Sequence, residues 1–240
     1  VLIYGLGKSG ISALNYLKQN NNCYVFDDDK SKNSKNFKKF FLNKSKIIDV
    51  QFDKIILSPG ININKCLLSN YLKKNQQKII SDLDIFYKFR PEILTISITG
   101  TNGKSTTSKL LYDILKCHGY DVRLTGNIGN PILEEKRIKK NTILVVEASS
   151  YQLAYSKYFR SKYSIILNIS HDHLERHLTM KNYISSKLRC VTNQKKNDIS
   201  IIPNINRIKS ILKTKLVKSN VIYLKQNKYV NFKQKIKNKY

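Results

Sequence analysis

The sequence contains no long uninterrupted apolar run, although 41% of its 240 residues are hydrophobic. A membrane-spanning helix needs about 20 consecutive apolar residues, so we expect no transmembrane segment and no membrane insertion. No signal peptide precedes the first apolar stretch, which begins at Val1. We therefore expect a cytoplasmic protein. The missing initiator methionine indicates a fragment whose first few residues are absent.

Cysteine is scarce and scattered. The four cysteines, Cys23, Cys66, Cys117 and Cys190, show no paired spacing. This distribution argues against a disulfide framework and against a zinc site built from cysteine pairs. We expect buried thiols in a reducing compartment.

Acidic residues are few: 16 Asp and Glu stand against 44 Lys and Arg, which gives a formal net charge of +28. Clustered basic residues bind nucleic acids by releasing counterions from the phosphate backbone. Here the lysines are spread along the whole chain among Asn, Ile and Tyr, residues that AT-rich codons encode, and no nucleic-acid-binding motif accompanies them. We interpret the charge as a base-composition effect on solvated surfaces and expect no nucleic-acid partner.

The most informative segment follows an apolar run from Ile93 to Ile98 and precedes a segment with helical spacing, in which Leu110/Ile114 and Leu111/Leu115 form i,i+4 pairs. A strand, a glycine turn and Lys-Ser at a helix start is the arrangement that binds nucleotide phosphates, because backbone N–H groups and a lysine surround the phosphate oxygens. The serine is placed to bind the Mg²⁺ that accompanies the nucleotide. The turn is shorter than the standard phosphate-binding loop, and its sequence is Gly100-Thr101-Asn102-Gly103-Lys104-Ser105-Thr106-Thr107.

A second glycine turn, Gly5-Leu6-Gly7-Lys8-Ser9-Gly10, lies between a predicted strand and a predicted helix near the start of the chain. A further strand, Cys23 to Phe26, ends in Asp27-Asp28-Asp29 about twenty residues on. Glycines at this spacing, followed by an acidic residue, are typical of a dinucleotide-binding βαβ unit. A Lys- and Asn-rich loop from Lys30 to Lys39 is expected to be mobile.

Other apolar strands also end in polar groups, which is where open parallel sheets bind ligands. These strand ends are Lys54–Leu57 before Ser58-Pro59-Gly60-Ile61, Thr142–Val146 before Glu147, and Ser164–Leu167 before Asn168. A helix is expected from about Lys181 to Gln194, and the chain is motif-poor from Lys195 onward. Alternating strands and helices predict a doubly wound α/β architecture with two domains, residues 1–91 and 92–240, divided near Arg90-Pro91.

Six motifs occur in an order that resembles the Mur ligase family, over roughly residues 1–194. They are Gly5–Gly10, Ser58–Ile61, Gly100–Thr107, Gly126-Asn127-Ile128-Gly129-Asn130-Pro131, Glu147-Ala148-Ser149-Ser150-Tyr151-Gln152-Leu153 and Asp172-His173-Leu174-Glu175-Arg176-His177. The resemblance implies a Rossmann-like N-terminal domain that binds a UDP-linked substrate, followed by an incomplete P-loop-type ATPase domain. It is greatest for the branch that adds D-glutamate to UDP-N-acetylmuramoyl-L-alanine in peptidoglycan synthesis.

The resemblance also implies a reaction and its partners. ATP phosphorylates the terminal carboxylate of UDP-N-acetylmuramoyl-L-alanine, and the amine of D-glutamate attacks the acyl phosphate. The cofactors would be ATP and Mg²⁺ at two sites, with a carbamate derived from CO₂ on Lys187, because a bare ammonium cannot bind a cation. We expect a monomer.

Site residues are carried over from the family by position. Catalytic roles fall to Lys104, Lys187 and His173. The nucleotide site would comprise Gly100, Thr101, Asn102, Gly103, Lys104, Ser105 and Thr106. Metal ligands would be Ser105, Glu147, His173 and Lys187. The UDP-linked substrate would contact Lys8, Ser9, Asp27 at uracil, Asp28, Ser58, Gly60, Asn127 and Gln152.

Simpler interpretations stay open for several of these residues. Asp28 and Asp29 could cap a loop, which we prefer for Asp29, while Asn127 and Gln152 could cap turns. His173 and His177 have the i,i+4 spacing of zinc ligands, but Leu174 stands where a metalloprotease has Glu. His171 is assigned no role.

Two other functions remain as alternatives. One is a related ligase with a different acceptor, and the other is a non-catalytic nucleotide- or nucleic-acid-binding remnant. Nothing after Lys195 resembles the C-terminal domain that holds D-glutamate in the family, so we expect either a truncated sequence or a degraded gene from a reduced genome. The chain alone is expected to bind nucleotide weakly and to show no D-glutamate-dependent phosphate release.

Overall fold

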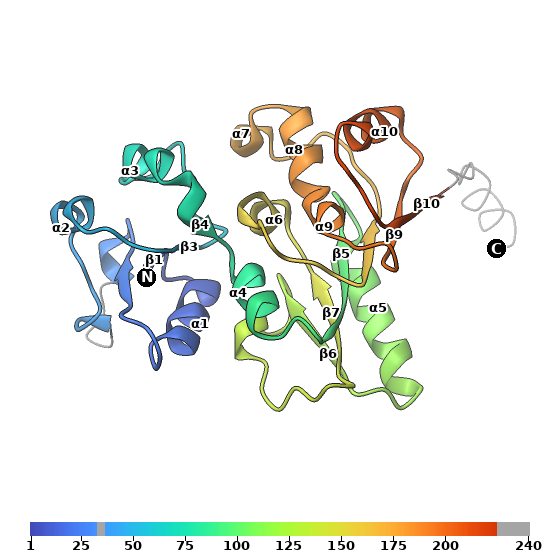
Figure 1. The fold of residues 1–240 in the computed structure, drawn as a ribbon, viewed down its shortest axis with the longest axis horizontal. Helices are drawn as coiled ribbons and strands as arrows, with labels where there is room; N and C mark the ends of the chain where they lie inside the picture. The colour runs from blue at the N-terminus through green and yellow to red at the C-terminus, as the bar shows by residue number, and fades with distance from the viewer. Residues whose placement is uncertain (33–36, 225–240) are drawn as a thin grey trace, which may run out of the picture.

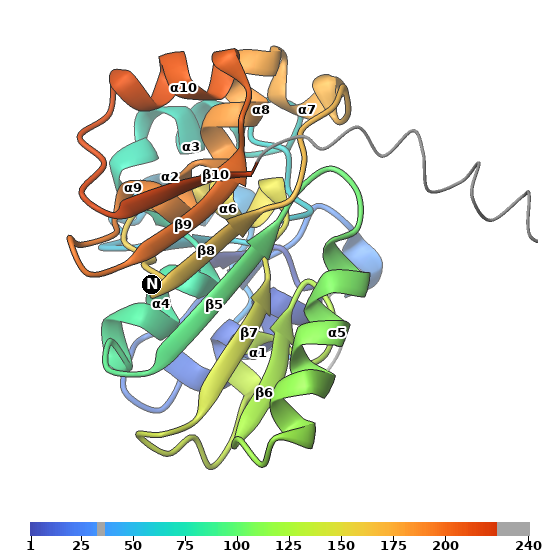
Figure 2. The same ribbon diagram turned by 90° about the vertical axis from the view of Figure 1, so that its right-hand side faces the viewer.

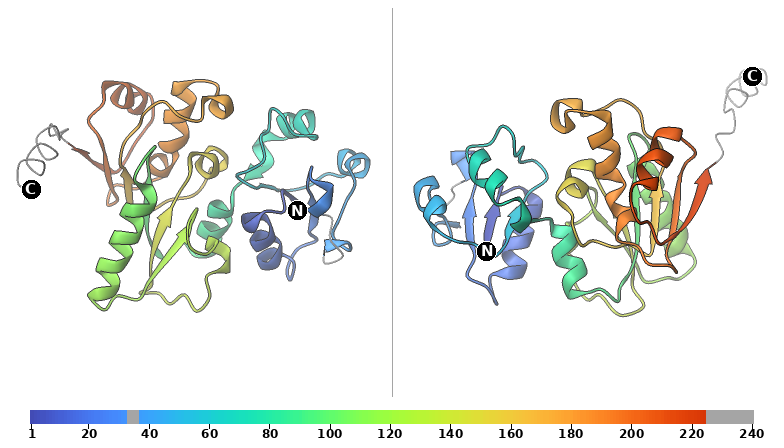
Figure 3. Two further views of the ribbon diagram at one scale, coloured as in Figure 1. Left: turned by 180° about the vertical axis from the view of Figure 1, so that it is seen from behind. Right: turned by 45° about the horizontal axis from the view of Figure 1, so that its top comes forward.

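The computed structural model describes residues 1–32 and 37–224. They form two parallel sheets with helices packed on them, and Figures 1 and 3 show the two sheets side by side. The first sheet is built from residues 2–80 and the second from residues 94–224. This confirms the predicted α/β class. The division of roles at residue 91 stays a prediction.

The first sheet has four parallel strands in the order β2-β1-β3-β4. They are β1 (Leu2–Tyr4), β2 (Tyr24–Phe26), β3 (Ile55–Leu57) and β4 (Ile79–Ile80). The register pairs Tyr4 with both Phe26 and Leu57. The segments that follow these three strands therefore leave the sheet at one edge.

The helices of this first part are short apart from α1. They are α1 (Lys8–Leu17), η1 (Lys30–Lys32), α2 (Lys44–Asp49), α3 (Ser69–Lys74) and η3 (Gln76–Lys78). The loop predicted to be mobile begins with η1, while its positions 33–36 lie outside the described residues.

The second sheet has six parallel strands in the order β10-β9-β8-β5-β7-β6, which can be followed across the sheet in Figure 2. They are β5 (Leu94–Thr99), β6 (Val122–Gly126), β7 (Ile143–Glu147), β8 (Tyr163–Ile166), β9 (Ile199–Pro203) and β10 (Asn220–Leu224). Glu147 lies opposite both Ile98 and Gly126, and Ile166 lies opposite Thr99. The ends of β5, β6, β7 and β8 are thus brought together.

The helices of the second part are α4 (Asp82–Phe89), α5 (Lys104–Cys117), η4 (Ile132–Glu134), α6 (Ser150–Tyr155), α7 (Leu174–His177), α8 (Met180–Lys187), α9 (Arg189–Thr192) and α10 (Asn206–Lys213). The single helix predicted from Lys181 to Gln194 is wrong, since α8 and α9 meet at Leu188. Leu188 and the neighbouring Cys190 and Val191 are fully buried, and separate short helices allow all three to reach the core.

Only one of the two predicted apolar pairs on α5 faces the sheet. Leu111 and Leu115 pack with Val145, whereas Leu110 and Ile114 are exposed. A helix lying on one face of a sheet buries a single stripe, and residues one position apart point about 100° from each other.

Regular structure continues beyond Lys195, where the sequence carries no motif. Strand β9 pairs with β8, and β10 pairs with β9. Helix α10 connects β9 to β10 in the sequence. Strand β10 has the sequence Asn-Val-Ile-Tyr-Leu and is largely exposed although four of its residues are apolar. Among the described residues, no helix combines the length and apolarity needed to cross a bilayer.

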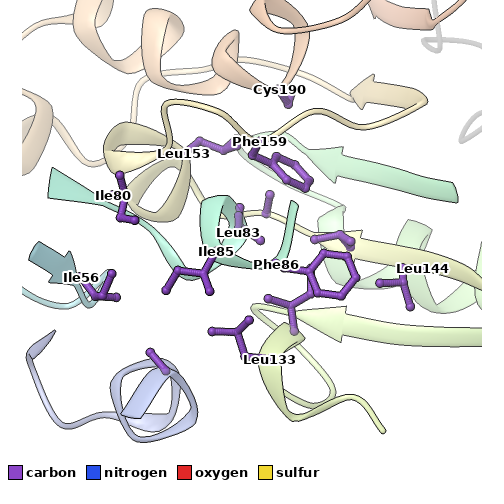
Figure 4. Close-up of a cluster of buried hydrophobic side chains, with 14 of the residues drawn as sticks. Ile56, Ile80, Leu83, Ile85, Phe86, Leu133, Leu144, Leu153, Phe159 and Cys190 are labelled. Carbon is purple, nitrogen blue, oxygen red and sulfur yellow. The ribbon is translucent and has the colours of Figure 1, made fainter. Parts of the chain in front are cut away.

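Helix α4 lies between the two sheets and joins their cores. Figure 4 shows its Ile85 and Phe86 between Ile56 of the first sheet and Leu144 of the second. One hydrophobic cluster includes all four side chains.

The cysteines are free thiols, but the expectation that all are buried is wrong, because Cys117 is exposed on α5.

Candidate active site

The first glycine turn leaves β1 and enters α1 at a very close approach. A Cβ atom on Gly10 would lie 1.8 Å from the carbonyl oxygen of Gly5, and Gly5 itself has a φ of +98°. Neither position tolerates a side chain. Gly7 at the start of α1 provides no side-chain cap, so the first N–H groups of the helix are available to an anion.

The three aspartates after β2 have different roles. Buried Asp27 accepts hydrogen bonds from the amide N of Leu6 at 2.5 Å and of Asp29 at 2.9 Å, which fixes the glycine turn. Asp28 accepts from the hydroxyl of Tyr4 at 2.5 Å and from the amide N of Leu67. Asp29 caps the loop by accepting from Ser31, as its preferred interpretation predicts.

The Ser58–Ile61 turn lies against the glycine turn. The hydroxyl of Ser58 donates to the carbonyl of Gly5 at 2.7 Å. Both turns open into a cavity of about 390 Å³ that is also bordered by the second sheet. Its lining comprises Gly5, Gly7, Lys8, Ser9, Asp27, Lys32, Ser58, Pro59, Gly60, Ile61, Gly126, Asn127, Gly129, Pro131 and Gln152. Seven of the eight residues predicted to contact the UDP-linked substrate are in this lining; Asp28 is the exception.

The phosphate-loop segment, residues 100–105, follows β5 and is shaped by Gly103. This residue has a φ of +81° and directly precedes α5. The Nζ atom of Lys104 donates to the carbonyls of Gly100 at 3.0 Å and Thr101 at 2.8 Å, so the ammonium lies over the loop. Ser105 and Thr106 are exposed in the first turn of α5.

The loop is held from two neighbouring elements. The side chain of Asn168, after β8, exchanges two hydrogen bonds of 2.9 Å with the backbone of Asn102. The hydroxyl of Thr101 contacts Tyr183 Oη at 3.0 Å and accepts from the amide N of Ser170. Because the Thr101 side chain is engaged inside the protein, its predicted contribution to nucleotide binding would be indirect.

Glu147 is completely buried at the end of β7. Its Oε1 accepts from the Nδ2 of Asn127 at 2.8 Å, and its backbone carbonyl accepts from the amide N of Asn127. Its Oε2 has no hydrogen-bond partner among the described residues. A buried carboxylate oxygen without a partner is costly, and a bound cation would satisfy it.

Lys187 is also buried, with 1% of its surface exposed. Its Nζ donates to the carbonyl of Gly100 at 2.8 Å, the same oxygen that Lys104 contacts, and lies 4.7 Å from the centre of the Tyr183 ring. Burial, and to a smaller extent the charge of Lys104, lower the pKa of Lys187 to about 7. A substantial fraction of this lysine is therefore a neutral amine at neutral pH.

The two histidines of the Asp172–His177 segment have different surroundings. His173 has a φ of +53° and is partly exposed, with Asp172 Oδ2 3.3 Å from its Nε2. His177 is buried, and its Nε2 contacts Ser150 Oγ at 3.0 Å. Burial and the charge of Arg176 lower the pKa of His177 to about 4. The ring of His177 thus stays neutral in the interior.

A family model described as the Mur ligase middle domain matches residues 98–240, which is more than half of the chain. The chain belongs to the Mur ligase family. It is 36% identical over 239 residues to a UDP-N-acetylmuramoylalanine–D-glutamate ligase of Caldicellulosiruptor bescii, covering 95% of this chain and 52% of that protein. The enzyme of the same name from Rickettsia prowazekii is 39% identical over 207 residues, covering 83% of this chain and 45% of the relative. The chain therefore spans about half the length of these curated relatives.

The fold also agrees with that of a solved Mur ligase. The UDP-N-acetylmuramate:L-alanyl-gamma-D-glutamyl-meso-diaminopimelate ligase from Neisseria meningitides superimposes with a TM-score of 0.55 at 13% identity. The match covers 92% of this chain and 76% of that one. At this identity the comparison supports the shared fold.

The Mur ligase resemblance implies Mg²⁺, which prefers oxygen ligands such as carboxylates. Among residues 1–32 and 37–224, no group of three or more His, Cys, Asp and Glu side chains is arranged to hold a metal. The implied set contains only Glu147 and His173 of these types, together with Ser105 and Lys187. The unpartnered Oε2 of Glu147 fits a hard cation, and Lys187 would fit once it carried a carboxylate.

Several buried or partly buried polar residues of the second part of the chain were not predicted from the sequence to make contacts. Buried Asp82 and Asp84 lie in the first turn of α4, and Asp84 forms a capping box with Ser81. The pattern Ser-x-x-Asp before an apolar run is a recognisable helix start and could have located α4. Arg176 and Tyr183 were also missed as contact residues, because their partners are distant in sequence.

Proposed function

We propose that this chain is part of an ATP-dependent ligase that joins D-glutamate to UDP-N-acetylmuramoyl-L-alanine. One observation carries the proposal: Asn127 lines the cavity of the first glycine turn and also hydrogen-bonds Glu147 beside the phosphate loop. A single turn therefore connects a site suited to a nucleotide-linked substrate with a site suited to a metal-bound triphosphate.

The cavity is suited to the UDP portion of the substrate. The free N–H groups at the start of α1, together with Lys8, would bind the negatively charged diphosphate. Asp27 lines the same cavity, and its carboxylate oxygens retain lone pairs for the N–H of uracil. The names of the relatives support this choice of substrate.

The phosphate loop is suited to ATP. In the ligand-free chain, the ammonium of Lys104 contacts carbonyls of its own loop and would turn to the β- and γ-phosphates when they arrive. Lys104 and the loop amides would then offset the charge that develops as the γ-phosphoryl group moves. The amide N of Asn102 already donates to Asn168, so the loop geometry is set before binding.

Glu147, Ser105, His173 and Lys187 would hold Mg²⁺ at two sites, and we keep this assignment as part of the proposal. Bound divalent cations neutralise negative charge on the phosphate oxygens. Lys187 would become a ligand by reacting as a neutral amine with CO₂, which forms a carbamate and releases one proton. Its pKa of about 7 favours this reaction near neutral pH.

The proposed reaction has two steps. The terminal carboxylate of UDP-N-acetylmuramoyl-L-alanine attacks the γ-phosphorus, and ADP leaves with the electron pair of the broken P–O bond. The amine of D-glutamate then attacks the acyl carbon, so that phosphate leaves, an amide forms and the amine loses a proton. The buried Glu147–Asn127 pair would fix the site at which the first step occurs.

The test is calorimetric titration of the chain with UDP-N-acetylmuramoyl-L-alanine, UDP-N-acetylglucosamine and Mg·ATP. We expect the muramoyl-alanine ligand to bind at least tenfold more tightly than UDP-N-acetylglucosamine. Glu147→Gln should abolish the Mg²⁺ dependence of ATP binding. Because Asn127 can still donate to the amide oxygen of Gln, this variant should keep the fold.

Two outcomes would favour the alternatives. Tighter binding of a longer UDP-linked muramoyl peptide would indicate a Mur ligase with another acceptor. Binding of duplex DNA that falls steeply with salt, without binding of either nucleotide ligand, would indicate a charge-driven nucleic-acid binder and would contradict the proposal.

A further inference from the structure

Arg176, on helix α7 of the second part of the chain, contacts the Ser58–Ile61 turn of the first part. Its guanidinium donates to three consecutive backbone carbonyls, those of Pro59 at 2.8 Å, Gly60 at 3.2 Å and Ile61. These residues precede Arg176 by more than 110 positions. Charge-assisted hydrogen bonds of this kind are about twice as strong as neutral ones and are directional.

Two tyrosines of α6 complete the contact. The guanidinium of Arg176 stacks on the ring of Tyr151 with its carbon 4.8 Å from the ring centre. It also donates to the hydroxyl of Tyr155 at 3.1 Å, and that hydroxyl donates to the carbonyl of Ile61 at 3.0 Å. The planar group is thus fixed on its face and along its edge.

From Tyr151 an aromatic cluster leads to the phosphate loop. The Tyr151 ring stacks on His177, with centroids 5.6 Å apart, and lies 4.9 Å from the ring of His173. The His177 ring is 5.2 Å from that of Tyr183. The hydroxyl of Tyr183 contacts Thr101 Oγ1, so packed side chains connect the two ligand sites without a gap.

Helix α7, which carries Arg176, has little local stability of its own. It comprises four residues and lies between His173 and Leu178, both of which have a positive φ. A single helical turn is not stable in isolation, so tertiary contacts must hold it in place. The contacts of Arg176 therefore fix α7 as well as the Ser58–Ile61 turn.

We propose that Arg176 is a positioning residue that fixes the Ser58–Ile61 turn relative to the phosphate loop, so that occupation of one ligand site raises the affinity of the other. The inference rests on the proposed function for the identity of the two ligands. Arg176 is absent from the cavity lining, whereas the turn that it holds is part of that lining. Removing the guanidinium would release the turn without removing a group that contacts either ligand.

The experiment measures linkage. UDP-N-acetylmuramoyl-L-alanine is titrated into the 240-residue chain with and without saturating Mg²⁺ and a non-hydrolysable ATP analogue. We expect the affinity to rise by about fivefold or more when the analogue is bound, a typical coupling between sites. In Arg176→Ala the ratio of the two affinities should fall to about 1, and in Arg176→Lys it should be intermediate, because an ammonium cannot contact three carbonyls in one plane.

Arg90→Ala is the matched control. Arg90 also donates to a backbone carbonyl, that of Ile138 at 2.7 Å, but it lies outside the cavity lining and the aromatic cluster. This variant should keep the wild-type linkage ratio. Full linkage in Arg176→Ala, or equal loss of linkage in Arg90→Ala, would overturn the inference.

A second measurement needs no ligand. The amide N of Ile61 donates to the carbonyl of Ser58 inside the turn. Hydrogen exchange at Ile61 should accelerate at least tenfold in Arg176→Ala and stay unchanged in Arg90→Ala; equal exchange in wild type and Arg176→Ala would refute the positioning role. If the wild-type chain binds neither ligand but hydrogen exchange at Ile61 still accelerates in Arg176→Ala, the proposed function is wrong. Arg176 would then only fix the Ser58–Ile61 turn.

Discussion

Asp84 provides a direct test of how helix α4 is held against the second part of the chain. Its Oδ1 accepts from the hydroxyl of Ser156 and from the amide N atoms of Lys157, Tyr158 and Phe159, at 2.7–3.0 Å. Its Oδ2 accepts from the amide N of Ser81 at 3.1 Å, and also from Lys157. A single buried carboxylate therefore binds the start of α4 to the segment after α6.

In Asp84→Ala, the amide groups of Lys157, Tyr158 and Phe159 would lose their acceptor. Each hydrogen bond to a charged group contributes roughly 1.5–3 kcal/mol, and partial access of water to Tyr158 reduces its share. The expected loss is about 3–6 kcal/mol of the free energy of unfolding. For a chain of this size, that loss corresponds to a fall in Tm of roughly 6–24 °C.

Asp84→Asn tests the contributions of the two carboxylate oxygens separately. The retained oxygen can still accept from Tyr158 and Phe159, whereas the new amide group would face two donors at the Oδ2 position. Its stability should lie between those of wild type and Asp84→Ala. The control is Asp113→Ala, because Asp113 is half exposed and pairs with Lys109 on the surface of α5. That change should alter stability by at most about 0.5 kcal/mol.

Urea unfolding followed by circular dichroism and by tyrosine fluorescence gives the measurement, since the chain has 15 tyrosines and no tryptophan. The midpoint should fall in the order wild type, Asp84→Asn, Asp84→Ala. A loss below about 1 kcal/mol in Asp84→Ala would show that the amide groups find water instead, and the structural role given to Asp84 would be wrong.

Three further outcomes are expected. The pKa of His177 falls from 6.5 to about 4 on folding, so the unfolded chain binds more protons than the folded chain between these pH values. The free energy of unfolding should therefore drop as the pH falls through this window. His177→Gln should flatten the dependence of the urea midpoint on pH. In NMR spectra recorded with ¹³C-bicarbonate, a carbamate signal from Lys187 should grow as the pH rises through about 7. Lys104→Met should move the pH midpoint of this rise upward. An unmoved midpoint would exclude the charge of Lys104 as a cause of the lowered pKa of Lys187. Gly103→Ala, at a φ of +81°, should cost about 1–2 kcal/mol and weaken Mg·ATP binding, whereas Gly60→Ala has no neighbour within 4 Å of its new Cβ and should leave the urea midpoint unchanged.

The local patterns of the sequence predicted the parts of the site that each lie within one short segment. Glycine turns between an apolar strand and a helix, at Gly5–Gly10 and Gly100–Ser105, need particular φ values and close backbone approach, and only glycine permits them. The rule that parallel sheets bind ligands at their carboxyl ends then placed Ser58, Glu147 and Asn168 near these turns.

Contacts between distant segments could not be predicted in this way. Asp84 meets Phe159, Thr101 meets Tyr183 and Arg176 meets Pro59, and the partners are separated by 75, 82 and 117 positions. Nothing in local spacing pairs such residues, because their meeting depends on the order of strands in two sheets. For the same reason, the sequence did not predict that the carboxylate of Asp28 accepts hydrogen bonds from Tyr4 and Leu67, and its contact with the substrate stays a prediction.

Some buried polar groups of the candidate active site have incomplete partners among the described residues. Within the part of the chain that the structure describes, Glu147 Oε2 is buried without a hydrogen-bond partner, while Lys104 and Lys187 bring two amino groups to the single carbonyl of Gly100. Each feature costs stability in the free chain, since buried charge without a counter-charge is unfavourable. A metal-bound triphosphate would supply a cation for the carboxylate and anions for the lysines. The strain of the free site thus favours the ligand-bound state, and binding should stabilise this part of the chain more than the rest.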